Sequence, residues 1–275
     1  SDVSHLAAYH FRQRKRLMES IKRTVNDWLD IRSIAYGPDD RQKLDVYPVR
    51  TTEPNPVIIF FYGGSWRSGD RSLYRFVGSI FRRRGFVVVI SDYRVYPTIK
   101  FPAFMDDAAA VVRWTRSEIS QFGGDSDRIM LMGHSAGAHM GALLLTNETF
   151  LDVQGLSPSI VKRFVGMSGP YSFDPLKYDS TADIFSTAEN IDDARPIANV
   201  SGDEPPMLLM HGAEDTTVLP VNTTELADAV KDRGGQAAHI IYPELAHSGI
   251  LLSVLAPLRW RAPVLRDCVH FLKTG

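Results

Sequence analysis

Short apolar runs alternate with longer amphipathic stretches along most of the chain. Most of the apolar runs are four to seven residues long, rich in β-branched or aromatic side chains, and without polar alternation. Runs of this kind are typical of strands that are buried on both faces of a parallel sheet. They cover Pro56–Tyr62, Phe86–Ser91, Arg128–Met132, Arg163–Met167, Pro206–Met210 and His239–Tyr242.

The stretches between these runs have the spacing of helices. They cover Arg71–Arg84, Phe104–Ser120, Ala136–Thr146, Val221–Arg233 and, at the end of the chain, Leu258–Leu272. Alternation of strands and helices predicts the α/β class, with a mostly parallel, doubly wound sheet that carries helices on both faces. Ser33–Tyr36 and Lys43–Tyr47, joined by a turn at 37–40, would add an antiparallel edge to that sheet.

Two regions do not follow this alternation. Residues 1–32 are predicted to form a helical extension, and the charged cluster at 12–16 is interpreted as a solvated helix face rather than as a site for an anionic partner. Residues 171–204 are long and irregular, which is typical of a functional lid or pocket wall. Since no segment has the character of a linker, residues 1–275 are predicted to form a single domain with a small lid.

Composition and charge narrow the classes of function. The chain carries 31 Lys and Arg against 32 Asp and Glu, so no net field attracts nucleic acid or an anionic membrane. Its apolar runs are far shorter than the ~20 residues of a membrane span. Cys268 is the single cysteine, which excludes an intramolecular disulfide and a multi-cysteine metal site. No histidine or carboxylate motif has the spacing of a metal site, so no metal is expected.

A chain without disulfides fits a cytoplasmic protein, which is the location we expect. Periplasmic proteins without disulfides are also common, and the sequence starts at Ser1 rather than at Met, so removal of a targeting segment stays open as an alternative. The sequence does not indicate an oligomeric state.

The strongest chemical signal is the pentapeptide Gly133-His134-Ser135-Ala136-Gly137, which lies between a predicted strand and a predicted helix. This is the G-x-S-x-G pattern in the strand–turn–helix context of a nucleophile elbow. A sharp turn there exposes the serine hydroxyl at a helix N-terminus, and the glycines leave room for the turn. The alternative is a glycine-rich helix start with a serine cap. The flanking elements favour Ser135 as a nucleophile.

A serine nucleophile needs a base and an acid that orients the base, and in this arrangement they follow in the order Ser, Asp or Glu, His. His247 follows the last predicted strand and is the candidate base. Glu214 and Asp215 follow the strand before it, and because they are adjacent only one can point at His247. The order and spacing leave that choice open. The remaining histidines, His211 among them, are interpreted as structural or surface residues.

A Gly-Gly turn follows the first long apolar run, in the segment Tyr62-Gly63-Gly64-Ser65-Trp66. Acyl transfer passes through a tetrahedral oxyanion, which is stabilised by preorganised N–H donors. The N–H groups of Gly64, Ser65 and Ala136 are the natural donors. An ordinary tight turn is the alternative, and the nearby elbow motif argues against it.

Together these segments resemble the α/β-hydrolase fold. The resemblance runs from about Tyr36 to the C-terminus and extends to 91–94, 101–107 and 122–129. Within the fold, the YGGSW segment is similar to the esterases with an HGGxW-type oxyanion motif, a group that includes prenylcysteine methylesterases, kynurenine formamidases and small carboxylesterases. Tyr62 departs from the usual His, and Ser65 replaces the third glycine of the HGGG lipases. The resemblance places Asp, hence Asp215, in the position of the acid.

The resemblance implies a serine carboxylesterase that cleaves small or aromatic esters through an acyl-enzyme and needs no cofactor. Its partner would be a small-molecule ester or amide. Trp66, Tyr93, Tyr171 and Phe173 are candidates for the substrate pocket, although each could equally be packed in the core. An arylformamidase that cleaves an N-formyl group fits the same residues. A non-catalytic binding protein of the same fold is the third alternative, and the retained Ser, Asp and His argue against it.

Overall fold

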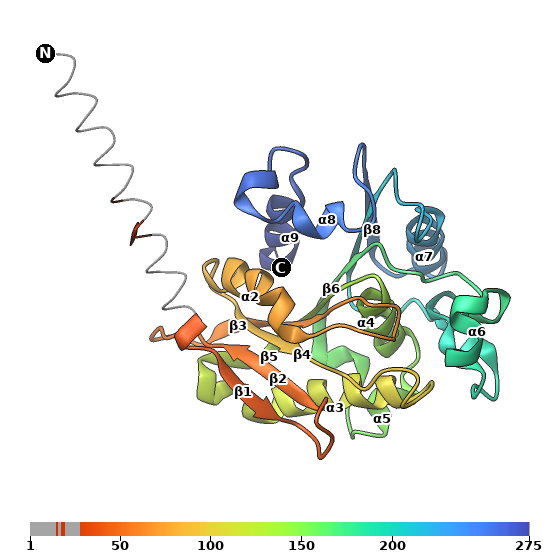
Figure 1. Cartoon of the computed structure of the whole chain (residues 1–275), viewed down its shortest axis with the longest axis horizontal. Coiled ribbons are helices and arrows are strands. Elements are labelled where there is room, and N and C mark those ends of the chain that lie inside the picture. The colour runs from red at the N-terminus through yellow and green to blue at the C-terminus, as the bar shows by residue number, and fades with distance from the viewer. Residues whose placement is uncertain (1–14, 16–17, 20–27, 275) are drawn as a thin grey trace, which may run out of the picture.

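The computed structural model describes residues 15, 18–19 and 28–274, so most of the predicted N-terminal helix over 1–32 lies outside the described residues. The core is an eight-stranded sheet in the order β1-β2-β4-β3-β5-β6-β7-β8 (Figure 1). Its strands are β1 (Arg32–Ala35), β2 (Lys43–Tyr47), β3 (Asn55–Phe61), β4 (Val87–Ser91), β5 (Gly124–His134), β6 (Val161–Met167), β7 (Met207–Gly212) and β8 (Ala237–Tyr242).

The strands pair as the sequence predicts. β3 to β8 are parallel to one another, whereas β1 pairs with β2, and β2 with β4, in antiparallel register. Every residue of β4 is buried, and so are the residues of β3 from Val57 onward. Strands covered on both faces need no polar alternation, which explains their continuous apolar sequence. The α/β class and the antiparallel edge are therefore confirmed.

Helices cover both faces of the sheet (Figure 1). In the figure α2 (Arg75–Arg82) and α9 (Val264–Lys273) lie on one face and α3 (Ala103–Glu118) on the other, where α3 packs against α4 (Ala136–Thr146). α7 (Val221–Asp232) packs against β7 and β8. The remaining short helices are α5 (Thr149–Asp152), α6 (Asp179–Phe185) and α8 (Gly249–Leu252). Single 3₁₀ turns lie at Arg71–Tyr74, Ile119–Phe122, Pro158–Ile160, Pro175–Lys177, Ile191–Ala194, Pro196–Asn199 and Ala256–Leu258.

Two predicted helices have different bounds in the structure. The stretch predicted over 71–84 divides into a 3₁₀ turn and then α2. The last helix does not begin at Leu258, because Pro263 lies inside the predicted range, and a proline in a helix interior loses a hydrogen bond and clashes with the preceding turn. Pro263 is instead the N-cap of α9, so the helix starts at Val264.

The parallel arrangement brings distant segments to one edge of the sheet. β3, β5, β7 and β8 all end at the same edge, and ligand sites in open α/β sheets lie outside the carboxyl ends of the strands. Residues 171–204 form short helices and 3₁₀ turns around α6. Throughout the described part of the chain, no helix has both the length and the apolar character needed to cross a lipid bilayer.

Candidate active site

Ser135 occupies a sharp turn between β5 and α4. Its φ of 55° and ψ of −123° lie in a region that non-glycine residues rarely adopt. The two flanking glycines have no room for a side chain. A Cβ on Gly133 would lie 2.5 Å from the Gly137 carbonyl oxygen, and a Cβ on Gly137 would lie 2.0 Å from the Phe61 carbonyl oxygen. The glycines of the motif therefore permit the close packing of the turn against β3.

Ser135, His247 and Asp215 form a chain of hydrogen bonds. Ser135 Oγ lies 2.8 Å from His247 Nε2, and His247 Nδ1 lies 2.7 Å from Asp215 Oδ2. Because an ionised carboxylate only accepts hydrogen bonds, Nδ1 carries the proton and Nε2 is free to accept from the serine. Glu214, the other candidate acid, is exposed. The fold thus unites three residues that stand 80 and 32 positions apart in the chain.

The environment of Asp215 favours its charged form. Burial alone would raise the pKa of this carboxyl, but hydrogen bonds from His211, from His247 and from the Val218 N–H outweigh burial and hold the pKa well below its usual range. Oδ1 accepts from the N–H groups of Thr217 and Val218 at 3.0 and 2.9 Å. A carboxylate fixed in this way holds the imidazole of His247 in one orientation and stabilises it when it takes up a proton.

His211, which the sequence indicated only as structural, lies directly behind this carboxylate. Its Nε2 is 3.1 Å from Asp215 Oδ2 and 2.8 Å from the Val218 carbonyl oxygen, while Nδ1 is 2.8 Å from Thr223 Oγ1. The imidazole is fully buried. It therefore links the loop after β7 to the first turn of α7, and the only sequence signal for this role was its position at the end of a strand.

His134, the residue before the serine, contacts the loop that carries His247. Its Nε2 donates to the main-chain oxygen of His247 at 2.9 Å, and the two imidazole rings are 4.9 Å apart. Burial is the main reason that the pKa of His134 falls to about 4, so this side chain is neutral at ordinary pH. A neutral His134 orients the backbone beside His247 without adding a second positive charge.

The turn after β3 places N–H groups beside the serine. Ser65 and Ala136 line the same cavity as Ser135, and Gly64 precedes Ser65 in the turn. Within the described chain the N–H groups of Gly64, Ser65 and Ala136 donate to no other group. Ser65 and Trp66 have φ values of 54° and 56°, so this turn holds two non-glycine residues in the left-handed region. Exposed donors in a turn of this kind can bind an oxyanion.

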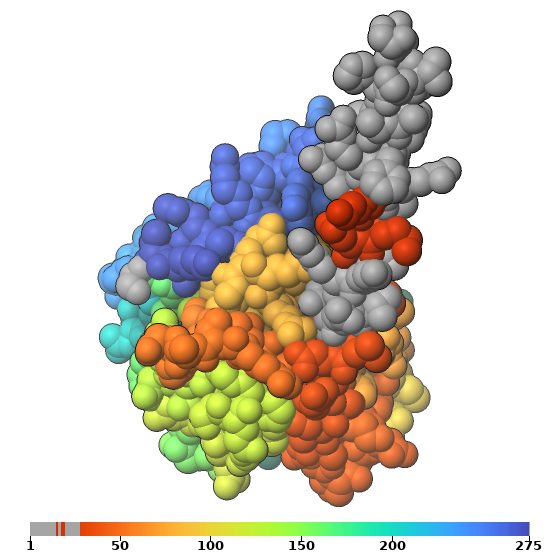
Figure 2. All heavy atoms as spheres, turned by 90° about the vertical axis from the view of Figure 1, so that its left-hand side faces the viewer, coloured from red at the N-terminus to blue at the C-terminus, as the bar shows by residue number. Residues whose placement is uncertain are grey.

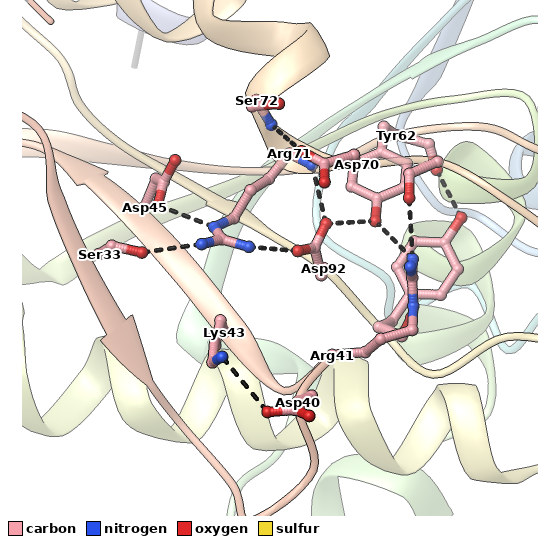
Figure 3. Close-up of polar contacts among 12 residues, drawn as sticks. Ser33, Asp40, Arg41, Lys43, Asp45, Tyr62, Asp70, Arg71, Ser72 and Asp92 are labelled. Atoms are coloured by element: carbon pink, nitrogen blue, oxygen red, sulfur yellow. Dashed lines mark hydrogen bonds and ion pairs between the residues drawn. The ribbon is translucent and has the colours of Figure 1, made fainter.

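A polar network supports the turn from behind (Figure 3). The Tyr62 hydroxyl donates to Asp92 Oδ1 at 2.6 Å, and Asp92 also accepts from the N–H and the guanidinium of Arg71. Arg41 donates to the Tyr62 hydroxyl and to the Gly69 carbonyl oxygen. Tyr62, which replaces the usual His of the oxyanion motif, thereby ties the end of β3 to the residue after β4.

A cavity of about 590 Å³ opens above Ser135. Two of the aromatic residues predicted for the pocket, Trp66 and Phe173, line this cavity. Their rings stack with centroids 6.0 Å apart. The other two lie elsewhere. Tyr93 is fully buried and donates from its hydroxyl to the Tyr62 carbonyl oxygen, and Tyr171 is fully buried against Gly166. Both contact the backbone beneath the cavity, and neither lines it.

Much of the cavity wall comes from residues that the sequence did not single out. The segment predicted as a lid contributes part of it, and the loop between β7 and α7, with the first two residues of α7, contributes another part. No motif marks these positions, because the shape of a loop depends on the fold around it. They are Pro170, Ser172, Asp174, Lys177, Tyr178, Ser180, Thr181, Arg195, Thr216, Thr217, Val218, Leu219, Val221 and Asn222.

His139 lies in α4 beneath Trp66 and makes the stability of the fold depend on pH. It is fully buried, its Nε2 donates to the Ala194 carbonyl oxygen at 2.8 Å, and its Nδ1 has no hydrogen-bond partner among the described residues. Burial lowers its pKa to about 4, below the ~6.5 of an unfolded histidine. The unfolded state therefore takes up a proton first as the pH falls. The contribution of neutral His139 to the free energy of unfolding is complete above pH ~6.5 and is lost as the pH falls from ~6.5 to ~4.

We expect the substitution His139→Gln to remove this part of the pH dependence, since the Gln amide can still donate to Ala194. Between pH 7.5 and pH 5.0 the free energy of unfolding of the unsubstituted protein should fall by about 2 kcal/mol more than that of the variant. Urea unfolding curves at the two pH values measure the difference. Equal pH dependence of both proteins would show that His139 is protonated without loss of stability.

Among the described residues, no three His, Cys, Asp or Glu side chains come together in an arrangement that could hold a metal ion. The chemistry available at this site is that of a serine hydroxyl, an imidazole and a carboxylate, with N–H donors next to them. This combination supports nucleophilic acyl transfer.

Comparisons with known proteins agree with the geometry. The chain is 30% identical to the isoprenylcysteine alpha-carbonyl methylesterase ICME of Arabidopsis thaliana, over 83% of this chain and 58% of that protein. It is 32% identical to the esterase LipC of Mycobacterium tuberculosis, over 69% of this chain and 52% of that protein. The chain therefore spans between half and three-fifths of the length of these relatives.

Solved structures share the fold. The esterase Est2 of Thermogutta terrifontis superposes with a TM-score of 0.74 at 24% identity, covering 88% of this chain and 91% of that one. A truncated carbohydrate esterase from gut microbiota gives a TM-score of 0.73 at 20% identity, covering 87% and 93%. The model of one family, described as BD-FAE, matches residues 44–230, which is more than half of the chain. The chain belongs to the BD-FAE family, a family of α/β-hydrolase-fold esterases.

Proposed function

We propose that this protein is a serine carboxylesterase that cleaves small or aromatic carboxylic esters through an acyl-enzyme. The observation that carries the proposal is the hydrogen-bonded series Ser135–His247–Asp215 at the floor of a cavity of about 590 Å³. A serine hydroxyl is a weak nucleophile unless a base takes its proton, and His247 is within hydrogen-bond reach of that proton. The relatives named as esterases support the same reaction class.

In the acylation step, Ser135 Oγ attacks the carbonyl carbon of the ester while His247 Nε2 takes the hydroxyl proton. The carbonyl oxygen becomes an oxyanion and accepts hydrogen bonds from the N–H groups of Gly64, Ser65 and Ala136. Asp215 stabilises the imidazolium that forms. The tetrahedral intermediate then collapses, the bond to the alcohol oxygen breaks, and His247 donates its proton to the leaving alcohol.

In the deacylation step, a water molecule takes the place of the alcohol. His247 removes a proton from this water as the water attacks the acyl carbon, and the same N–H groups bind the second oxyanion. Collapse of this intermediate releases the carboxylic acid and returns the proton to Ser135. The cycle uses only groups of this chain and water, so the proposed reaction needs no cofactor.

The cavity suits an uncharged ester of modest size. Its volume lies within the ~300–1,000 Å³ that is usual for small-molecule sites. The stacked rings of Trp66 and Phe173 form an apolar wall on which an aromatic group can pack. The small net charge of −1 also fits a neutral substrate. An N-formyl amide would react in the same way, and the ratio of kcat/KM for p-nitrophenyl acetate to that for N-formylkynurenine separates the two activities.

The Gly-Gly turn provides a test of the proposed oxyanion site. Gly64 has a φ of 136°, and a Cβ there would lie 2.1 Å from the Ser68 carbonyl oxygen, so Gly64→Ala must displace the turn and with it the Ser65 N–H. Because this N–H acts on the transition state, we expect kcat for p-nitrophenyl acetate to fall about 10²- to 10³-fold, with a smaller change in KM.

Gly155→Ala is the matched control for this substitution. Gly155 also has a positive φ, 71°, but a Cβ there would contact nothing within 4 Å. It lies in the loop after α5 and does not line the cavity at Ser135. Its kcat should equal that of the unsubstituted protein. A Gly64→Ala variant that is folded, as shown by circular dichroism, and that keeps its full kcat would contradict the assignment of this turn.

A further inference from the structure

A second cavity lies beside α9 and the turn that follows α2, on a face that the proposed reaction does not use. The two helices lie side by side in Figures 1 and 2. The cavity has a volume of about 550 Å³, which is close to that of the cavity at Ser135, and the two share no lining residue. Arg84 lies in the loop between α2 and β4, before the amino end of that strand. Ser135 lies beyond the carboxyl end of β5. The second cavity is therefore a separate feature of the fold.

The polar groups that line this cavity are basic. Three guanidinium groups and one imidazole reach it, from Arg84, Arg259, Arg266 and His270, and no carboxylate is among the lining residues that the structure describes. The nearest acid on α9, Asp267, is already engaged, because it accepts from Arg266 and from the Tyr242 hydroxyl. Within the described part of the chain, Asp267 therefore pairs with Arg266, and the charges of Arg84 and Arg259 have no matching carboxylate.

Two of these arginines have no ion pair within the described chain. Arg84 donates from Nη1 to the Ile80 carbonyl oxygen, and Arg259 donates from Nε to the Val254 carbonyl oxygen. These hydrogen bonds fix the guanidinium groups and leave their other N–H groups available. Burial, followed by the charges of Arg259 and Arg83, lowers the pKa of Arg84, which shows that the neighbouring cations repel one another. An anion bound between Arg84 and Arg259 would relieve that repulsion.

The rest of the lining is apolar. Leu265 and Val269 come from α9, and Ala262 and Pro263 come from the segment before it. We propose that this cavity binds an organic anion, with its carboxylate or phosphate group held by Arg84 and Arg259 and its apolar body packed against Leu265 and Val269. Planar guanidinium groups match the geometry of both anions, and the volume is that of a site for a small molecule.

Calorimetric titration of the full chain with octanoate tests the proposal. We expect octanoate to bind, and the double variant Arg84→Gln/Arg259→Gln to weaken its Kd at least tenfold. Octanol has the same apolar body without the charge and should bind at least tenfold more weakly than octanoate. Arg113→Gln is the control for the type of substitution, because it removes one arginine charge from an exposed position on α3, across the sheet from α2 and α9, and should leave the Kd unchanged.

Three outcomes would overturn the proposal. The first is binding of octanol as tightly as octanoate, since the arginines would then contribute nothing. The second is octanoate binding that the double variant leaves unchanged and that competes with p-nitrophenyl acetate, which would place the ligand at Ser135. The third is binding of phosphatidylglycerol vesicles, lost in the double variant, without any binding of octanoate, which would make the arginines a contact for membrane lipids. Esterase activity of the double variant is expected to be normal, so this test is independent of the proposed reaction.

Discussion

Replacing Ser135 by Ala is expected to reduce kcat for p-nitrophenyl acetate by about 10⁴- to 10⁶-fold. The substitution removes the atom that would form the acyl bond, while His247 and Asp215 keep their hydrogen bond to each other. Any residual rate would come from water activated next to the N–H donors, because those groups remain in place. KM should change far less than kcat, since the cavity around the serine keeps its lining.

A second measurement tests whether the loss of kcat comes from the missing Ser135 hydroxyl. An organophosphate that modifies activated serines should add one adduct to the unsubstituted protein, visible by intact-mass spectrometry, and none to the Ser135→Ala variant. Ser117→Ala, at an exposed position on α3, is the control and should keep both the activity and the adduct. Retention of the full rate by a folded Ser135→Ala variant would refute the proposed function.

Replacing Asp215 by Asn is expected to lower kcat about 10⁴-fold. The amide is nearly the same size as the carboxylate, but one of the two oxygens becomes an NH₂ group. In Asp215 one oxygen faces His247 Nδ1 and the other accepts from the Thr217 and Val218 N–H groups. An Asn that keeps its oxygen on these two N–H groups directs its NH₂ at His247, and the imidazole must then carry its proton on Nε2. In that tautomer His247 cannot accept the proton of Ser135. Steady-state kinetics with p-nitrophenyl acetate measure the effect.

Glu214→Gln is the matched control for Asp215→Asn. The two residues are adjacent and the substitutions remove the same charge, but Glu214 is exposed, whereas Asp215 is buried against His247. The control should keep its activity within about twofold. Equal losses in both variants would indicate that the activity depends on the net charge of the loop and not on the contact between Asp215 and His247.

The local sequence was sufficient to predict the elements and the elbow. Continuous apolar runs can be strands only if both faces are covered, so the runs around β3 and β4 predicted a sheet with helices on both sides. The G-x-S-x-G pentapeptide is informative for a similar reason, because Gly137 packs against the Phe61 carbonyl oxygen at a distance that admits no Cβ. In both cases a packing requirement decides which residue types a segment can carry. The segment can therefore be recognised from its own residues, without knowledge of the fold.

Helix bounds and the aromatic positions were less predictable. Apolar spacing alone predicted that the last helix begins at Leu258. A helix from Leu258 would have Pro263 in its interior, and the helix instead begins after this proline. Tyr93 and Tyr171 have the same aromatic character as Trp66 and Phe173, but the sheet places the first two beneath the cavity and the last two on its wall. An aromatic side chain favours burial in either place, so its residue type does not distinguish a core position from a pocket position.

The sequence by itself predicted the class of fold, the order of its elements, the serine of the elbow and the histidine of the last strand loop, because these follow from local patterns and from their order along the chain. Spacing left Glu214 and Asp215 open and the family resemblance favoured Asp215, and the tertiary structure places Asp215 against His247. Only the tertiary structure decided that His211 and His134 support the loops of the site and that Arg84 and Arg259 share one cavity. These are contacts between residues far apart in the chain. Their geometry depends on how the strands are ordered and how the loops pack, and no single segment carries that information.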